Sequence, residues 1–146
     1  MINILKITAE QIHQEVDDFC QENRIDQYPP FESYFNDIRD QLEIIIKESD
    51  RLFSSTSSIV NQGLTDILSA SYQLEANAAL LGNSIQNKLL STAGQTSTSR
   101  TSAMFNSAKS WLKTTFLPWI SNLGASIQAS CGINRVILEP VFNASL

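Results

Sequence analysis

The sequence predicts a mainly α-helical protein, an antiparallel helical bundle built on a long helical hairpin. Two observations support this fold. Apolar residues recur at helical spacing over two long stretches, and segments rich in Ser and Thr separate these stretches from one another and from the C-terminal part of the chain. The 146 residues are enough for one domain with a hydrophobic core, which we place at 1–146.

The chain begins with a short apolar segment whose partial alternation is compatible with a strand, formed by Ile2, Ile4, Leu5 and Ile7. Residues 8–11 then match a capping box, in which the side chains of Thr8 and Gln11 satisfy backbone N–H groups at a helix start. We therefore expect a helix from about Thr8 to Asn23. Its narrow apolar stripe consists of Ile12, Val16 and Phe19.

Two apolar seams with steps of four and three residues predict the long hairpin, because this spacing is typical of coiled coils and other packed helices. The first seam consists of Phe31, Phe35, Ile38, Leu42, Ile45, Ser49, Leu52, Thr56 and Ile59. The second seam is one residue out of phase and consists of Val60, Leu64, Ile67, Ser71, Leu74, Ala78, Leu81 and Ile85. The Ser and Thr residues at 54–58 compete for backbone hydrogen bonds, so we expect the turn there, with Gly63 and Gly82 as alternative break points.

A flexible Ser/Thr-rich loop is predicted at about 91–102, where nine of the twelve residues are Ser, Thr or Gly. A helix should follow from Ala103, and Pro118 should kink it or start a new one. The segment from Arg135 to Phe142 is short and rich in β-branched residues. It is either an extended tail on the bundle or one strand of a small terminal β-ribbon with Ile2–Ile7.

The charge is unevenly distributed along this acidic chain. Residues 1–51 contain 12 acidic and 5 basic residues, whereas residues 52–146 contain 3 acidic and 5 basic ones. The net charge of −5 argues against a nucleic-acid binder, which needs a basic face to neutralise phosphates. The later part is kept polar by Ser, Thr, Asn and Gln, which indicates either helices that pack against a partner or a composition bias of the organism.

Neither a signal peptide nor a transmembrane helix is predicted. The first residues lack a basic region followed by a long apolar stretch. The longest charge-free stretch, 114–134, contains too many Ser, Thr, Asn and Gln residues to span a membrane. We expect a soluble protein, cytoplasmic by default, with reduced Cys20 and Cys131. The alternative is one disulfide between these two residues.

Residues suited to catalysis or metal binding are few. His13, Asp17 and Cys20 share one flank of the first predicted helix, but no second His or Cys pair completes a zinc site. The same His13 is the only histidine that could activate a nucleophile, and the five glycines form no phosphate-binding loop. The sequence therefore predicts no enzyme, no cofactor, no metal site and no small-molecule substrate.

The strongest functional candidate is the segment from Arg100 to Trp119, whose charged residues are all basic and which holds both tryptophans. A basic aromatic helix can lie in a partner's groove or in a membrane interface. The alternative is that its aromatic residues fill the core of the bundle. The predicted partner-binding residues are Phe105, Lys109, Trp111, Leu112, Phe116 and Trp119.

We expect a non-enzymatic helical interaction module, a subunit of a homo- or hetero-oligomeric complex. Its partner would be another protein or a second copy, bound by the aromatic segment and by seam residues left unpaired in the bundle. The alternative is a membrane-active helical protein, such as a secreted effector or pore-forming subunit, that uses the basic aromatic helix 103–119. A membrane surface is favoured less, because each of the three basic residues adds only about 1 kcal/mol of attraction to an anionic surface.

Overall fold

The computed structural model describes residues 3–29, 31–54, 57–92 and 99–132. These residues form five α-helices, a 3₁₀ turn (η1) and a π-helical segment (η2). In chain order they are α1 (Ile4–Asn23), η1 (Ile25–Gln27), α2 (Glu32–Ser54), α3 (Ser57–Thr92), α4 (Ser99–Trp111), η2 (Leu112–Phe116) and α5 (Leu117–Cys131).

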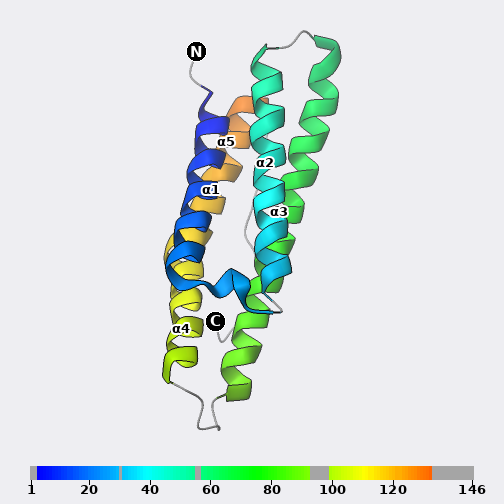
Figure 1. The fold of residues 1–146 in the computed structure, drawn as a ribbon. Coiled ribbons are helices and arrows are strands. Elements are labelled where there is room, and N and C mark those ends of the chain that lie inside the picture. The colour runs from blue at the N-terminus through cyan, green and yellow to red at the C-terminus, as the bar shows by residue number, and fades with distance from the viewer. Residues whose placement is uncertain (1–2, 30, 55–56, 93–98, 133–146) are drawn as a thin grey trace.

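The helices form a bundle around the α2–α3 hairpin, as predicted (Figure 1). α1 packs along α2, and the ion pair between Lys6 Nζ and Asp50 Oδ1, 3.1 Å long, together with a 3.3 Å contact between His13 and Glu43, fixes their antiparallel register. α4, η2 and α5 follow one another without a gap. In this continuous rod, α4 packs against α3, and α5 packs against α1. The C-terminal helices thereby complete the bundle.

Where the structure describes their side chains, the residues of both predicted seams are buried, apart from the half-buried Leu52 and Leu64. Buried residues of the first seam are Phe31, Phe35, Ile38, Leu42, Ile45 and Ser49. Buried residues of the second seam are Ile67, Ser71, Leu74, Ala78, Leu81 and Ile85. Full burial of an aliphatic or aromatic side chain contributes roughly 1.5–3 kcal/mol, so these seams are a main source of the bundle's stability.

The turn of the hairpin lies where the sequence predicts it. α2 ends at Ser54 and α3 begins at Ser57, whereas Gly63 and Gly82 both lie inside α3. A Cβ at position 63 would lie 3.0 Å from Leu52 Cδ2, so the glycine lets α2 and α3 approach closely.

The predicted N-terminal strand is wrong, because residues 4–7 form the first turn of α1. Asn3 caps this helix, and its Oδ1 accepts a hydrogen bond of 3.0 Å from the Lys6 N–H. Thr8 is therefore not a cap; it lies within α1, with its hydroxyl 3.3 Å from that of Ser126 in α5. The predicted β-ribbon is not formed by residues 4–7, and its second strand, 135–142, lies outside the described residues.

The predicted loop at 91–102 is too long at both ends. α3 continues to Thr92, and α4 already begins at Ser99, four residues before the predicted start at Ala103. Residues 93–98 lie outside the described residues. Ser and Thr at helix ends satisfy backbone groups there, so their abundance does not by itself separate a loop from a terminal helical turn.

The prediction that Pro118 starts a new helix is confirmed, because α5 begins at Leu117, although it follows η2 without a gap. Pro118 lies in the first turn of α5, directly after the π-helical segment η2. The N–H of Leu117 donates to the carbonyl of Leu112, five residues earlier, as π-helical geometry requires. Proline has no N–H to donate, so the wider π turn accommodates Pro118 where a regular α-helix would lose a bond and meet a clash.

Candidate functional site

The predicted aromatic binding segment lies mostly inside the bundle. Phe105, Leu112 and Phe116 are fully buried, and Trp111 is only 8% exposed. Trp111 stacks on Phe19 of α1 with a centroid distance of 4.5 Å. The alternative interpretation, that these residues fill the core, therefore describes four of the six predicted residues in the folded bundle.

The π-helical segment brings two of these side chains together. Trp111 and Phe116 stack with their ring centroids 4.9 Å apart, although they are five residues apart in sequence. In an α-helix with 3.6 residues per turn, positions five apart point in directions about 140° apart. The wider turn of η2 reduces this angle, so both rings face the core at the junction of α4 and α5.

The remaining two predicted residues, Lys109 and Trp119, are only half-buried. Trp119 packs against the core from its edge. Lys109 is the one charged residue among the six. These two side chains are the only members of the predicted set that a partner could reach without opening the bundle.

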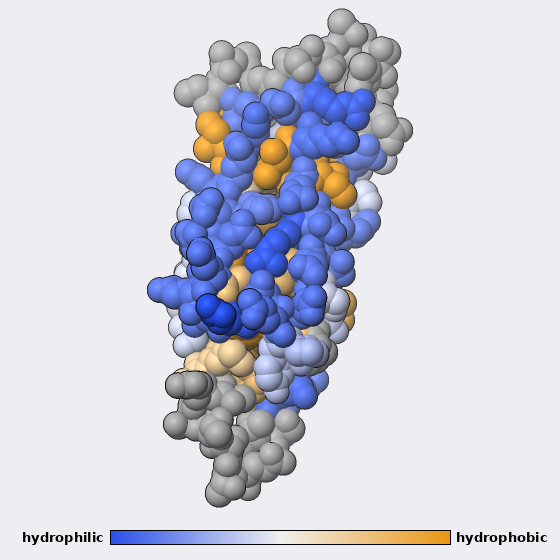
Figure 2. Space-filling model, viewed as in Figure 1, coloured by the Kyte–Doolittle hydropathy of each residue, from blue (hydrophilic) through white to orange (hydrophobic). Residues whose placement is uncertain are grey.

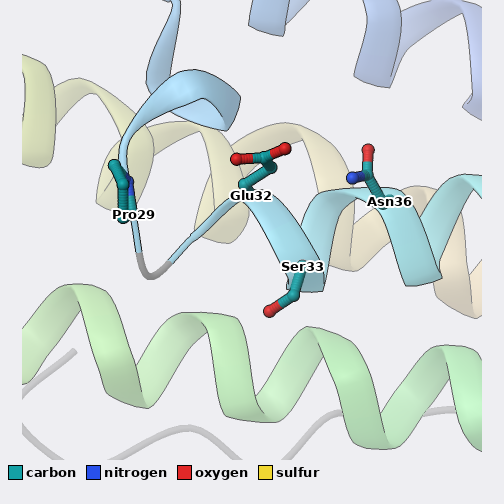
Figure 3. A pocket seen from close by; sticks show the side chains of 4 residues that line it. All are labelled: Pro29, Glu32, Ser33 and Asn36. Carbon is teal, nitrogen blue, oxygen red and sulfur yellow. The ribbon is translucent and has the colours of Figure 1, made fainter.

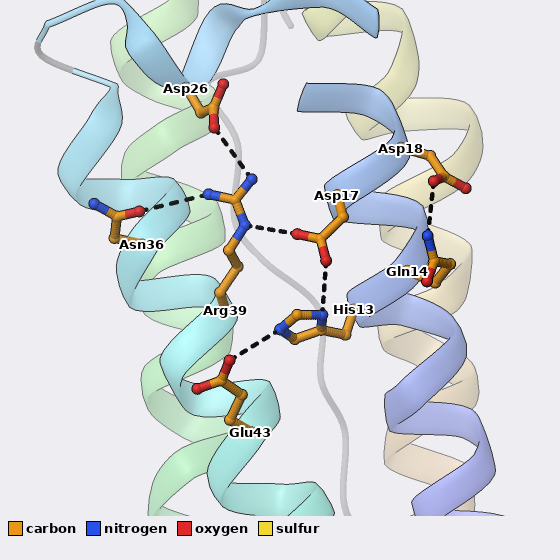
Figure 4. Close-up of polar contacts among 8 residues, drawn as sticks. All are labelled: His13, Gln14, Asp17, Asp18, Asp26, Asn36, Arg39 and Glu43. Carbon is orange, nitrogen blue, oxygen red and sulfur yellow. Dashed lines mark hydrogen bonds and ion pairs between the residues drawn. The ribbon is translucent and has the colours of Figure 1, made fainter. Parts of the chain in front are cut away.

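A polar cluster joins α1, η1 and α2 (Figure 4). Arg39 donates from Nε to Asp17 Oδ1 at 2.9 Å and from Nη2 to Asp26 Oδ2 at 3.2 Å. His13 lies between two carboxylates, 3.1 Å from Asp17 Oδ2 and 3.3 Å from Glu43 Oε1. The charged groups of this cluster bind one another and thereby hold α1, η1 and α2 together. We call this cluster the Arg39 clamp.

Cys20 lies beside this cluster, but its thiol is not activated. Burial raises its pKa to about 12, and the nearby Asp26 carboxylate acts in the same direction. A thiol with this pKa stays protonated at neutral pH and is a poor nucleophile or metal ligand. Cys20 and Cys131 are both free thiols. Among the described residues, no group of three His, Cys, Asp or Glu side chains is arranged to hold a metal ion.

Two hollows on the described surface are open and lined mainly by polar residues. One lies at the start of α2 and is lined by Pro29, Glu32, Ser33 and Asn36 (Figure 3). Another lies beside Arg39, and its lining includes Asp17, Cys20 and Asp26. A small-molecule site usually encloses its ligand within mostly apolar walls, and neither hollow does so.

The outer side of α3 is the surface that sequence reasoning missed. Between residues 63 and 90, all exposed side chains of α3 are uncharged; the three charged ones, Asp66, Glu75 and Lys88, are half-buried. We call this surface the uncharged α3 face. It consists of the exposed residues Thr65, Ser69, Tyr72, Gln73, Ala76, Leu80, Asn87 and Leu90.

Large apolar side chains stand out on this face. Tyr72 is 53% exposed, Leu80 50% and Leu90 59%. Seen with α1 and α2 in front, the molecule is mainly hydrophilic, with only separate apolar spots (Figure 2). The uncharged α3 face is about 38 Å long at 1.5 Å per residue, so the exposed apolar groups are distributed over a long helical stripe.

A signal for this face is present in the sequence. Most of its residues recur at steps of three, four or seven, on the side of the helix opposite the second seam. The apolar seam defines only the inner side of the helix, however, and the absence of charge on the outer side is not itself a periodic pattern. The absence of charge identifies a surface only after the burial of Ile67, Leu74 and Leu81 shows which side of the helix faces the core.

No known protein-family model, curated protein or solved structure matches this chain. None of the described helices is both long and apolar enough to cross a membrane.

Proposed function

We propose that this chain is a non-enzymatic helical binding module that packs the uncharged α3 face against a helix of another protein molecule. The observation that carries the proposal is the exposure of Tyr72, Leu80 and Leu90 on a long helix whose fully exposed side chains between residues 63 and 90 are all uncharged. A surface helix of a globular protein normally carries charged residues on its solvent side.

Helix-to-helix packing is the binding mode that suits this surface. Side chains three, four and seven residues apart form the stripe that one helix presents to another. Removing the remaining exposed area of Tyr72, Leu80 or Leu90 from water is worth about 1 kcal/mol for each side chain. The polar residues between them are Ser, Thr, Asn and Gln, which lose less hydration on burial than charged side chains do.

The aromatic segment has a different part in this proposal. Its buried residues support α4 and α5 against α1 and α3, and of the six predicted binding residues only Lys109 and Trp119 are partly exposed. A membrane-active protein that used this segment would first have to expose Phe105, Trp111 and Phe116, at a cost of roughly 1.5–3 kcal/mol for each aromatic residue. The bundle therefore favours protein binding over the membrane alternative.

Site-specific photocrosslinking tests the proposal. A photoreactive residue placed at Leu80 or Leu90 should form discrete adducts with a protein in an extract of the source cells. The matched control is Ile44 of α2, an aliphatic residue that is 39% exposed on a different helix. We expect no discrete adduct from position 44, because the proposed contact surface does not include α2.

Equal adduct patterns at positions 80 and 44, or no adduct at any α3 position, would contradict the proposal. Flotation of the purified protein with vesicles of anionic lipid addresses the membrane alternative. We expect the protein to remain in the unbound fraction. Flotation that is lost when Trp119 is replaced by Ser would favour the membrane-active protein instead.

A further inference from the structure

Seven residues on the outer side of α3 are arranged symmetrically about Ala76, and Gln73 and Leu90 of the uncharged α3 face lie outside this arrangement. Tyr72 and Leu80, four residues from Ala76 on either side, are both large and apolar. The pairs seven and eleven residues away, Ser69 with Asn83 and Thr65 with Asn87, are polar. All of them are exposed except Asn83, which is half-buried. In chain order this symmetric stripe is Thr65, Ser69, Tyr72, Ala76, Leu80, Asn83 and Asn87.

Such a symmetric stripe is complementary to a second copy of itself. In a contact with two-fold symmetry, the same surface serves both molecules, and residue i of one copy meets residue j of the other while j meets i. An antiparallel pair of α3 helices centred on Ala76 places Tyr72 of each copy against Leu80 of the other. The small Ala76 side chains meet at the two-fold axis, where they allow the helices to approach closely. Within the seven symmetric residues, polar residues meet polar residues on both sides of the axis.

The charge distribution also favours a second copy on this surface. Residues 1–51 hold 12 of the 15 acidic residues, and these residues form α1, η1 and most of α2. Two copies joined through those helices would bring like charges together. The exposed residues of the uncharged α3 face carry no charge, and Glu75 beside them is half-buried, so a contact there brings fewer like charges together. A charged foreign partner would find no complementary charge there to steer its approach.

We infer that the occupant of the uncharged α3 face is a second copy of this chain, with the two α3 helices packed antiparallel and Ala76 at the two-fold axis. This inference rests on the proposed function and names its partner. Antiparallel packing also places the positive N-terminal end of one helix dipole beside the negative C-terminal end of the other.

The size of the face indicates a weak dimer. A helix is about 10 Å wide with its side chains, so a stripe about 38 Å long covers on the order of 400 Å² in each copy. A standard stable interface covers about 800 Å² in each partner. We therefore expect a weak dimer in exchange with the monomer.

The mass of the purified protein in solution tests the second copy directly. Light scattering or sedimentation over a range of protein concentrations should show a mass that rises from one chain toward two. Ala76→Glu should raise the dimer dissociation constant at least about tenfold, because it places two carboxylates at the two-fold axis. Ala125→Glu is the matched control at an exposed alanine of α5, and we expect it to leave the dissociation constant unchanged.

Disulfide crosslinking tests the antiparallel register. In a Cys131→Ser background, the Ala76→Cys protein should form a disulfide-linked dimer on mild oxidation, because position 76 lies beside its own copy. Ser69→Cys is the control, since the two copies of position 69 would lie about 21 Å apart along the helices at 1.5 Å per residue. Cys20 can be retained, because its thiol is buried. Equal crosslinking of the two variants would overturn the antiparallel register.

A monomeric mass at all concentrations would overturn the inference that the partner is a second copy. This failure differs from failure of the proposed function, because the two experiments use different samples. A monomeric purified protein with adducts to a different protein at positions 80 and 90 would refute the second copy alone. A monomeric protein without α3 adducts would refute both.

Discussion

Leu80 and Leu81 are consecutive residues of α3 that face opposite environments: Leu81 is fully buried, whereas Leu80 is 50% exposed. The helical rotation of about 100° per residue separates the core stripe from the outer side of the helix. Two adjacent leucines therefore have different structural roles. Leu81 stabilises the bundle, and Leu80 is available for the helix contact that we propose.

This pair gives a direct prediction for stability. Leu81→Ala should lower the free energy of unfolding by about 2–5 kcal/mol, because it removes buried methyl groups and leaves a cavity. Leu80→Ala should change the stability of the monomer by no more than about 0.5 kcal/mol. Urea denaturation of both variants, at a concentration where the protein is monomeric, checks this. Equal losses would contradict the inward and outward assignment of the two leucines.

Trp111 should be a core residue in stability measurements. Replacing it by Ala should lower the free energy of unfolding by about 3–5 kcal/mol, because its ring stacks on both Phe19 and Phe116. Trp119→Ala is the matched control and should cost less, because Trp119 is half-buried. If Trp111→Ala prevents folding, Trp111→Phe keeps the measurement possible. A Trp111 variant as stable as the parent would show that the ring is not packed.

The Arg39 clamp should stabilise the bundle more than a surface ion pair does. Arg39→Ala removes hydrogen bonds to Asp17 and Asp26 and should cost roughly 1–3 kcal/mol. Lys6→Ala breaks the more exposed pair with Asp50 and should cost less than about 1 kcal/mol. Thermal unfolding of the two variants in the same buffer compares them. A larger loss from Lys6→Ala would be inconsistent with the clamp.

Cys20 should make the bundle less stable in alkali. Its pKa is raised from 9.0 to about 12 by burial in the folded protein, so the folded state binds the proton more tightly than the unfolded state. The resulting stabilisation is fully present below pH 9.0 and is lost as the pH rises toward 12. The parent should therefore lose stability over this range faster than Cys20→Ala does. Parallel pH profiles of unfolding free energy for the two proteins would contradict this prediction.

The hairpin could be predicted because its periodic pattern is long. Each seam repeats over several helical turns, and the Ser/Thr segment between them coincides with the change of phase. The N-terminal helix could not be assigned in the same way, because four apolar residues are too few to distinguish alternation from helical spacing. Packing of Leu5 and Ala9 against the core, together with the Asn3 cap, decides in favour of helix.

The candidate site was harder to predict, because amphipathicity does not say what covers the apolar side of a helix. The residues of the aromatic segment fit a partner's groove and a bundle core equally well by sequence. Their burial depends on the packing of α1 against α5 and on the π turn that orients Trp111 and Phe116. No local pattern encodes that packing. The uncharged α3 face became visible only when burial separated the inner side of α3 from its outer side.

Hydroxyl-radical footprinting tests most directly whether the uncharged α3 face is the contact surface. At a concentration where the parent protein is dimeric, oxidation of Tyr72 and Leu80 should be several-fold slower in the parent than in the monomeric Ala76→Glu variant. Oxidation of Ile44 should be the same in both proteins, because α2 lies outside the proposed contact. Equal oxidation rates of Tyr72 and Leu80 in the two proteins, or protection of Ile44 instead, would contradict the proposed contact surface.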